Sequence, residues 1–255
     1  MSKQSDLING TFTDSIDVTG TVVADGLTVD GSGGQVTTDN NGFIISKQLL
    51  DVETAGGRFI GKSNRGELGH IAIEQTATSA DGGYIRFATS PAGSTTPADR
   101  MRIDSTGAVT MPYQPAFSVN KNNVDQNNIA TGSEVIITWD TARFDQNSDF
   151  DLATNTFTAP ITGKYQINLF LRLNSIDTAS NNYIIYINTS NVEYKYLIDP
   201  LFTTDPAYWS FNLSVLADMD IGDTAQARVS QSGGTAQTDI SGAWSYTNFQ
   251  GYLVC

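Results

Sequence analysis

Apolar and polar residues alternate along three segments in the second half of the chain: residues 165–174, 192–198 and 209–217. A period of two places successive side chains on opposite faces of an extended strand, so each segment is predicted to be a strand with one buried face. Segments rich in Gly, Thr, Asn, Ser and Asp separate the three, and none of them keeps the period of a helix. The pattern predicts an all-β domain, either a sandwich or a jelly roll.

The first half of the chain shows shorter apolar runs with glycines between them. Within residues 14–31, Ile16, Val18, Val22, Leu27 and Val29 alternate with polar residues and Asp-Gly turns. Strands this short cannot bury an apolar face alone, because an isolated hairpin is only marginally stable in water. Three chains wound around one axis would share that face, and a flexible Gly/Thr linker is the alternative. Further short β segments are predicted at residues 43–45, 58–61, 70–74, 84–88 and 99–111.

Large aromatic side chains, which dominate ordinary cores, are unevenly distributed. Residues 1–112 contain Phe12, Phe43, Phe59, Tyr84 and Phe87, and the rest of the 12 Phe, 10 Tyr and 3 Trp lie in residues 113–255. The C-terminal part can therefore fold around its own core, whereas the N-terminal part must either be disordered or borrow burial from neighbouring chains. We divide the chain into a polar segment (1–15), a trimeric β-rich stalk of intertwined short strands (16–112) and a head (113–255).

Charge argues against a nucleic-acid partner, and the length of the apolar runs argues against membrane insertion. The formal net charge is −13, with 14 Lys and Arg among 27 Asp and Glu. Nucleic-acid binding by counterion release needs clustered basic residues, so we expect no nucleic-acid partner. No apolar run approaches the roughly 20 residues of a membrane span, and we expect no membrane insertion. The N-terminus begins without the apolar region of a signal peptide. Cys255 is the single cysteine, and pairing between chains remains open.

Candidate catalytic chemistry is sparse, and we predict that the protein is not an enzyme. His70 is the only histidine, so a Ser-His-Asp triad has no second candidate base. A glycosidase would need two carboxylates across a groove. We predict no cofactor and no metal site, with Ca²⁺ binding as the alternative, because turn aspartates usually only cap their turns. The carboxylates that offer oxygens to Ca²⁺ form two clusters: Asp145, Asp149 and Asp151, and Asp218, Asp220 and Asp223.

Aromatic residues in two loops are the better binding candidates. Phe202, Tyr208 and Trp209 belong to a Pro-bounded segment, and Trp244 and Tyr246 lie in another turn-rich stretch. Aromatic rings bind sugar rings or anchor protein partners, so these five residues are predicted to bind a receptor. For Trp209, the alternation in residues 209–217 favours a core position instead.

The run RMRIDSTGAVTMP (residues 100–112) resembles the closing segment of stalk modules in phage tail-fibre proteins. Met101 and Ile103 point to one side of a strand and Arg102 to the other, and Ser-Thr-Gly makes the following turn. The resemblance implies a bacteriophage structural protein, made in the host cytoplasm and located in the virion.

Residues 113–255 contain a series of aromatic, acidic and glycine residues: Trp139, Asp145, Phe150, Phe157, Gly163 and Tyr165. These positions, and the segments 157–168, 219–229 and 247–254, resemble the signature of the C1q/tumour-necrosis-factor-like domain. The resemblance implies a jelly roll of about ten strands that packs as a tight homotrimer. It also implies that the last strand lies near the trimer axis, with Phe249 and Leu253 buried at or near the interface.

Glycine is expected at position 163 because a tight turn there tolerates positive φ, and Gly222 is expected to serve in the same way. Truncation after Asn248 would remove Phe249 and Leu253, and we expect it to unfold the head.

These features together predict a trimeric virion fibre or spike. Residues 1–15 would attach to another tail or baseplate protein, and the C1q-like head would recognise a glycan or protein of the host cell surface. A capsid decoration or head-fibre protein without a specific receptor is the alternative. A polysaccharide depolymerase is a third alternative.

Overall fold

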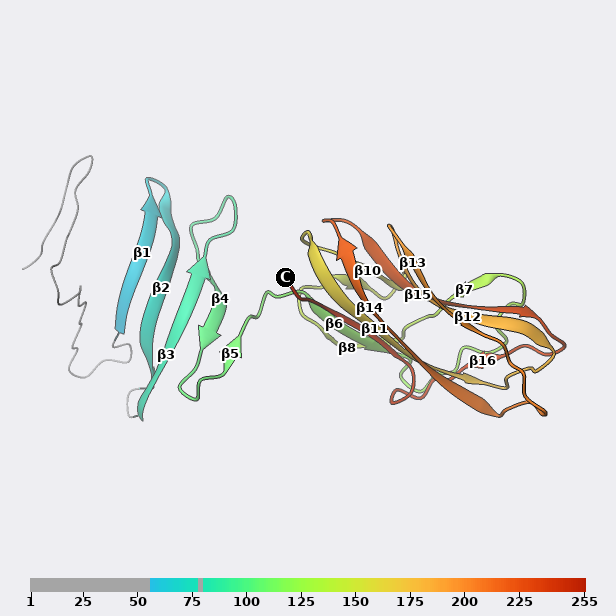
Figure 1. The fold of residues 1–255 in the computed structure, drawn as a ribbon. Coiled ribbons are helices and arrows are strands. Elements are labelled where there is room, and N and C mark those ends of the chain that lie inside the picture. Colours follow the sequence, from blue (N-terminus) through green and yellow to red (C-terminus); the bar gives the residue numbers. More distant parts are fainter. Residues whose placement is uncertain (1–55, 78–79) are drawn as a thin grey trace, which may run out of the picture. The chain divides into compact units, whose positions relative to one another are not determined.

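The computed structural model describes residues 56–77 and 80–255, and every element in these ranges is a β-strand (Figure 1). The all-β fold class is thereby confirmed. The predicted attachment segment, the alternating run at 14–31 and the short segment at 43–45 lie outside the described residues. No helix in the described ranges could span a membrane.

The first described unit is an antiparallel sheet of five strands in sequential order, from β1 to β5. Its strands are β1 (Gly56–Ser63), β2 (Gly66–Ala77), β3 (Ala80–Thr89), β4 (Ala98–Ile103) and β5 (Val109–Thr110). β2 and β3 extend beyond the apolar runs at 70–74 and 84–88, because the glycine and polar residues that flank those runs also pair in the ladder.

The turn between β4 and β5 forms as the stalk-like motif predicts. The carboxylate of Asp104 accepts hydrogen bonds from the backbone N–H groups of Thr106 (2.8 Å) and Ala108 (3.0 Å) and from the Thr106 hydroxyl (2.7 Å). These hydrogen bonds, led by that of the Thr106 hydroxyl, lower the pKa of Asp104. Gly107 supplies the left-handed backbone with a φ of 88°.

The head is a sandwich of two antiparallel sheets. One has the order β14-β11-β17-β6-β8, with β16 also paired to β11. The other has the order β13-β12-β15-β10-β9, with β7 also paired to β15. The chain alternates between the two sheets as it passes through β6, β10, β11, β12, β14, β15 and β17, which is jelly-roll connectivity. Its strands are β6 (Ala116–Asn120), β7 (Glu134–Ile136), β8 (Thr141–Asp145), β9 (Phe150–Asp151), β10 (Thr156–Thr158), β11 (Gly163–Asn174), β12 (Ser180–Thr189), β13 (Glu193–Ile198), β14 (Tyr208–Met219), β15 (Thr224–Gly233), β16 (Asp239–Ile240) and β17 (Asn248–Leu253).

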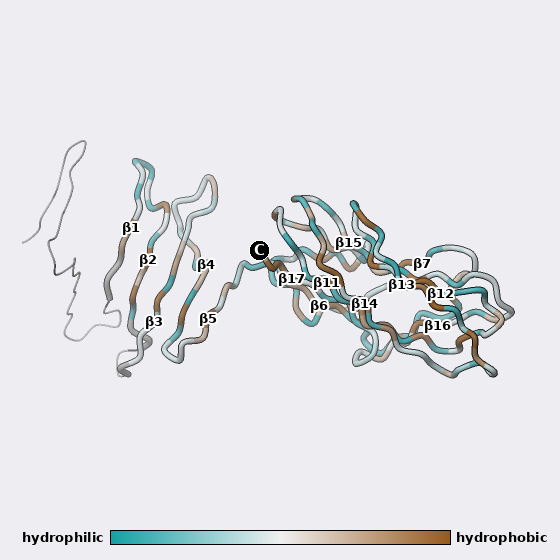
Figure 2. The backbone as a smooth tube through the Cα atoms, in the orientation of Figure 1, coloured by the Kyte–Doolittle hydropathy of each residue, from teal (hydrophilic) through white to brown (hydrophobic). Residues whose placement is uncertain are grey.

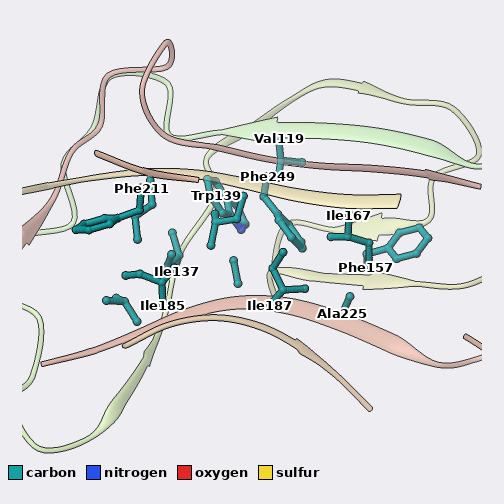
Figure 3. Packing of buried hydrophobic residues seen from close by; sticks show 14 of the residues in the cluster. Val119, Ile137, Trp139, Phe157, Ile167, Ile185, Ile187, Phe211, Ala225 and Phe249 are labelled. Atoms are coloured by element: carbon teal, nitrogen blue, oxygen red, sulfur yellow. The ribbon is translucent and has the colours of Figure 1, made fainter. Parts of the chain in front are cut away.

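The core lies between the two sheets and contains an aromatic cluster (Figure 3). The ring of Phe117 stacks on Phe157 at 4.7 Å and meets Phe249 edge-on at 5.3 Å. Trp139 stacks on Phe249 at 5.9 Å between ring centroids. Offset and edge-to-face pairs of this kind add to the stabilisation from burial itself. The structure places six of the signature and terminal-strand residues in this core: Trp139, Phe150, Phe157, Tyr165, Phe249 and Leu253.

The last strand, β17, lies in the interior of its sheet, between β11 and β6. Phe249 and Leu253 point into the sandwich of their own chain, whereas Tyr252 points outward. The strand is therefore an internal part of the head, and its removal would split the sheet by taking one ladder partner from each of β11 and β6.

Glycine is required at positions 222 and 163 for different structural reasons. Gly222 adopts a φ of 90°, as expected for its turn. Gly163 is not in the left-handed region, so that part of the prediction is wrong. Its reason is close approach, because a Cβ atom there would lie 2.6 Å from the carbonyl oxygen of Cys255 and 2.6 Å from Cδ1 of Leu253. The chain end passes over this position, and a larger residue would displace it.

Candidate interaction surfaces

One outer face of the head combines aromatic and amide side chains. It consists of the outward side chains of β6, β8, β11, β14 and β17 together with Trp244 and Tyr246, which precede β17 and lie against arginines of these strands, and we call it the amide–aromatic face. The strand register aligns Phe144 with Ser118, Gln250 and Asn168 in one row across four strands. The neighbouring row includes Phe170, and Tyr252 and Leu216 are exposed on the same face. Exposed aromatic and apolar groups that gather on one face indicate a contact surface.

Two arginines lie against aromatic rings of this face. The guanidinium of Arg172 lies 5.5 Å from the ring centroid of Tyr208 and 4.5 Å from that of Tyr246. The guanidinium of Arg143 lies 4.9 Å from the ring centroid of Trp244. A cation over a ring face attracts the ring electrostatically, and Tyr208, Tyr246 and Trp244 all remain exposed. The fold thereby joins Tyr208 from the first predicted loop to Tyr246 from the second.

A groove of about 580 Å³ runs across this face. Its walls include the rings of Phe144, Phe170 and Trp244 and the polar groups of Asn248 and Gln250. The volume falls within the range typical of small-ligand sites. Apolar walls with a few polar groups can hold a ligand that has both apolar surface and hydroxyl groups.

The centre of the amide–aromatic face is hydrogen-bonded and uncharged. Gln166 donates to the Ser214 hydroxyl at 2.9 Å, and that hydroxyl donates to Asn168 Oδ1 at 2.7 Å. The only carboxylate at an outward position of β11, β14 or β17 is Asp218, at one end and paired with Lys164. An interface core has this composition, because a buried charge without a partner is costly.

The outer face of the other sheet has a different character. Arg228 pairs with Glu134 at 3.0 Å, and Lys195 pairs with Glu193 at 2.8 Å. Exposed ion pairs of this kind contribute little to stability and are typical of a solvated surface.

Phe202 and Trp209 lie at the edge of the sandwich, where their ring centroids are 4.6 Å apart. Trp209 is 39% exposed, although the alternation favoured a core position. The prediction fails because β14 and β13 are both edge strands, so no further strand covers the space beside Trp209. Trp209 stacks on Phe211, which is buried. Of the five predicted receptor-binding residues, two therefore lie at this edge and three belong to the amide–aromatic face.

The candidate metal ligands are engaged in turns. Both carboxylate oxygens of Asp145 accept backbone N–H groups, from Asp149 (3.0 Å) and Phe150 (3.1 Å). Backbone and side-chain hydrogen bonds to Ala153 and Thr154 lower the pKa of Asp151. Within residues 56–77 and 80–255, no group of three or more His, Cys, Asp or Glu side chains could hold a metal ion.

Two further acidic groups are in contrasting positions. Burial raises the pKa of Asp149, and the negative charge of Asp145 adds to the effect. Oδ2 of Asp149 is buried and has no hydrogen-bond partner. Asp223 accepts hydrogen bonds from Asp220, Ser190 and Asn191, led by the backbone of Asp220, and these lower its pKa. Asp223 therefore organises a turn, whereas Asp149 is a destabilised carboxylate.

The single histidine, His70, and the single cysteine, Cys255, do not belong to these clusters. Nδ1 of His70 contacts Oε1 of Glu67 in the β1–β5 sheet, and Cys255 is exposed at the chain end. The absence of enzymatic activity stays a prediction.

Sequence reasoning missed Arg143, Phe144, Phe170 and Arg172 as members of the surface. Phe170 and Arg172 carried a usable signal, because both occupy the polar phase of the alternating segment 165–174. An aromatic residue in that phase must point away from the core.

Comparisons with known proteins identify similar folds among solved structures. The globular domain of zebrafish complement 1qA protein is 18% identical over 56% of this chain and 98% of its own, with a TM-score of 0.39. Murine APRIL is 11% identical over 55% of this chain and 99% of its own, with a TM-score of 0.41. No protein-family model and no curated protein matches the chain. At these values the likeness supports no argument about function, and the jelly-roll assignment rests on the strand order.

Proposed function

We propose that the chain is a bacteriophage fibre protein, that three copies form one fibre, and that its head binds a glycan on the host surface. The amide–aromatic face carries this proposal. It combines exposed rings, amides and two arginines, one of which, Arg143, lines a groove of about 580 Å³, in a chain of net charge −13. The phage source is supported by the resemblance of residues 100–112 to fibre stalk modules.

The groove suits a sugar for three reasons. The rings of Trp244 and Phe144 offer apolar surface to the C–H faces of a pyranose. Asn248 and Gln250 can donate to and accept from hydroxyl groups. Arg143, held over Trp244, adds a cation that favours a sugar with an acidic group.

Assembly as a homotrimer would strengthen weak binding. Three sites on one rigid body bind a repetitive surface with avidity, without any new contact. The N-terminal segment, residues 1–15, would dock on a tail or baseplate protein of the virion. A depolymerase with the same fold would release reducing sugar from host polysaccharide, and the proposal expects none.

The test measures binding of fluorescently labelled full-length protein to host cells. Tyr246→Ala and Trp244→Ala should each reduce binding at least tenfold, on the order of the 1–2 kcal/mol or more that anchor residues contribute. The matched control is Tyr196→Ala, because Tyr196 and Tyr246 are both 50% exposed and Tyr196 lies on an edge strand of the other sheet. The control should bind as the unmodified protein does.

Each outcome of this test indicates what the amide–aromatic face binds. Loss of cell binding with an unchanged mass near three chains by light scattering supports the proposal, and competition by purified host glycan identifies the ligand class. Unchanged binding by both variants refutes the glycan site. Loss of the trimer mass would instead assign the face to contacts between copies. Intact particles labelled on the capsid, with no cell binding, would favour the decoration alternative.

A further inference from the structure

The β1–β5 sheet buries polar side chains and exposes apolar ones. One face carries eight apolar residues that the register aligns across all five strands, and we call it the apolar face. Ile73 is 57% exposed on this face, whereas Glu74, the next residue and on the opposite face, is 7% exposed. Figure 2 shows hydrophobic and hydrophilic positions alternating along these strands. The apolar face consists of Phe59, Ile71, Ile73, Ile85, Phe87, Met101, Ile103 and Val109.

The opposite face covers itself. Glu74 accepts hydrogen bonds from the Tyr84 hydroxyl (2.7 Å) and from Arg86 (2.9 Å), and Arg86 also pairs with Asp99 at 3.0 Å. The guanidinium of Arg102 lies 4.0 Å from the ring centroid of Tyr84. These long side chains lie across the strands, cover the buried Ala72 and satisfy one another's polar groups. This face therefore needs no partner.

The apolar face does need one. Four of its members, Phe59, Ile71, Ile73 and Val109, are between 43% and 57% exposed, and the other four are partly buried. Eight side chains in this state expose on the order of 500 Å² of apolar surface, comparable to the largest patch on a typical monomer. None of the eight is charged.

We infer that the apolar face of the β1–β5 sheet packs against the same face of further copies of this chain. The inference rests on the proposed homotrimer and names the surface that holds its stalk together. Chains with a net charge of −13 repel one another, so close approach requires a face without carboxylates. An identical face also matches this one in length and width, and the symmetry of a homo-oligomer brings identical faces around one axis.

Cysteine probes in full-length protein with Cys255→Ser test the inference. Val109→Cys and Thr110→Cys form a matched pair, because both residues are exposed and neighbouring, and they point to opposite faces of β5. Ile73→Cys provides a second probe of the apolar face. Maleimide should alkylate the cysteines at 109 and 73 at least about tenfold more slowly than the cysteine at 110, because a covered thiol reacts slowly. A bismaleimide should join chains through 73 or 109.

The outcomes separate this inference from the proposed function. Protection at 73 and 109 together with interchain cross-links supports the inference. Equal alkylation of all three variants in a protein whose mass is that of three chains overturns it and leaves the head's function intact. Protection that disappears when residues 1–46 are deleted, without interchain cross-links, assigns the cover to the chain's own N-terminal segment and also overturns it. A monomer by light scattering overturns both proposals.

Discussion

The aromatic ring of Phe249 should contribute more to head stability than any other single side chain of the last strand. Phe249 is fully buried, and its ring lies 5.3 Å from Phe117, 5.9 Å from Trp139 and 6.2 Å from Phe150. Replacement of a core Phe by Ala typically costs about 3–5 kcal/mol, because the loss of transfer free energy is increased by the cavity that remains. The three ring pairs place Phe249→Ala towards the upper end of that range.

A loss of about 4 kcal/mol is a large fraction of the roughly 5–15 kcal/mol by which a domain is usually stable. For a domain of this size it corresponds to a decrease in Tm of roughly 10–15 °C. The matched control is Tyr252→Ala, in the same strand, because Tyr252 is outward and half-exposed. Its cost should stay within about 1 kcal/mol.

Urea unfolding followed by tryptophan fluorescence measures both variants at one protein concentration, since assembly makes apparent stability concentration-dependent. The reasoning about the core is refuted if Phe249→Ala loses less than about 1 kcal/mol, or if Tyr252→Ala loses as much as Phe249→Ala. A cost for Tyr252→Ala that shrinks on dilution would instead place Tyr252 in a contact between copies. Truncation after Asn248, which removes most of an internal strand, should prevent the head from folding at all.

Three further predictions follow from local geometry. Gly163→Ala should cost about 1–3 kcal/mol in urea unfolding, because its Cβ would clash with the Cys255 carbonyl oxygen; an unchanged midpoint would contradict this contact. Glu74→Gln should lower the pKa of Tyr84, which the hydrogen bond to Glu74 raises; an ultraviolet titration in which the tyrosine signal does not move would count against the network. Asp149→Asn should stabilise the head at pH 7 and not near pH 3. Burial raises the folded pKa of Asp149, so the folded chain retains a proton that the unfolded chain has lost, and the free energy of unfolding falls as pH rises from about 3.9 through the raised pKa. Equal stability of the two proteins at pH 7 would show that the carboxylate is not penalised.

The extent to which the fold could be predicted is best seen in β11. Alternation in residues 165–174 predicted this strand because one of its faces is fully buried, and burial preserves a period of two. The same pattern wrongly predicted a core position for Trp209, because the period continues there but the strand lies at the edge of its sheet. Periodicity states which residues share a face, and only the arrangement of strands states whether that face is covered.

The sequence could indicate single residues of the candidate site, but not which of them the fold brings together. Aromatic residues in turn-rich segments indicated Tyr208 and Tyr246 separately. Their approach to Arg172 depends on the pairing of β11 with β14 and on the path of the chain after β16, and both are long-range features. Gly163 illustrates the same limit, because its reason is the chain end, 92 positions away in sequence.

The distribution of carboxylates connects the two proposed contact surfaces. The chain has 27 acidic residues, yet none lies among the eight positions of the apolar face. Asp218 is the one acidic residue at an outward position of β11, β14 or β17, and it is paired with Lys164. At physiological ionic strength, charges remain unscreened only within about 8 Å, so acids harm an interface chiefly when they lie in the contact itself. A surface that contacts another copy of this acidic chain must be free of unpaired carboxylates. The same holds for a surface that contacts an acidic glycan. The ion-paired outer face of β12, β13 and β15 meets no such requirement, and we expect it to face solvent in the assembled protein.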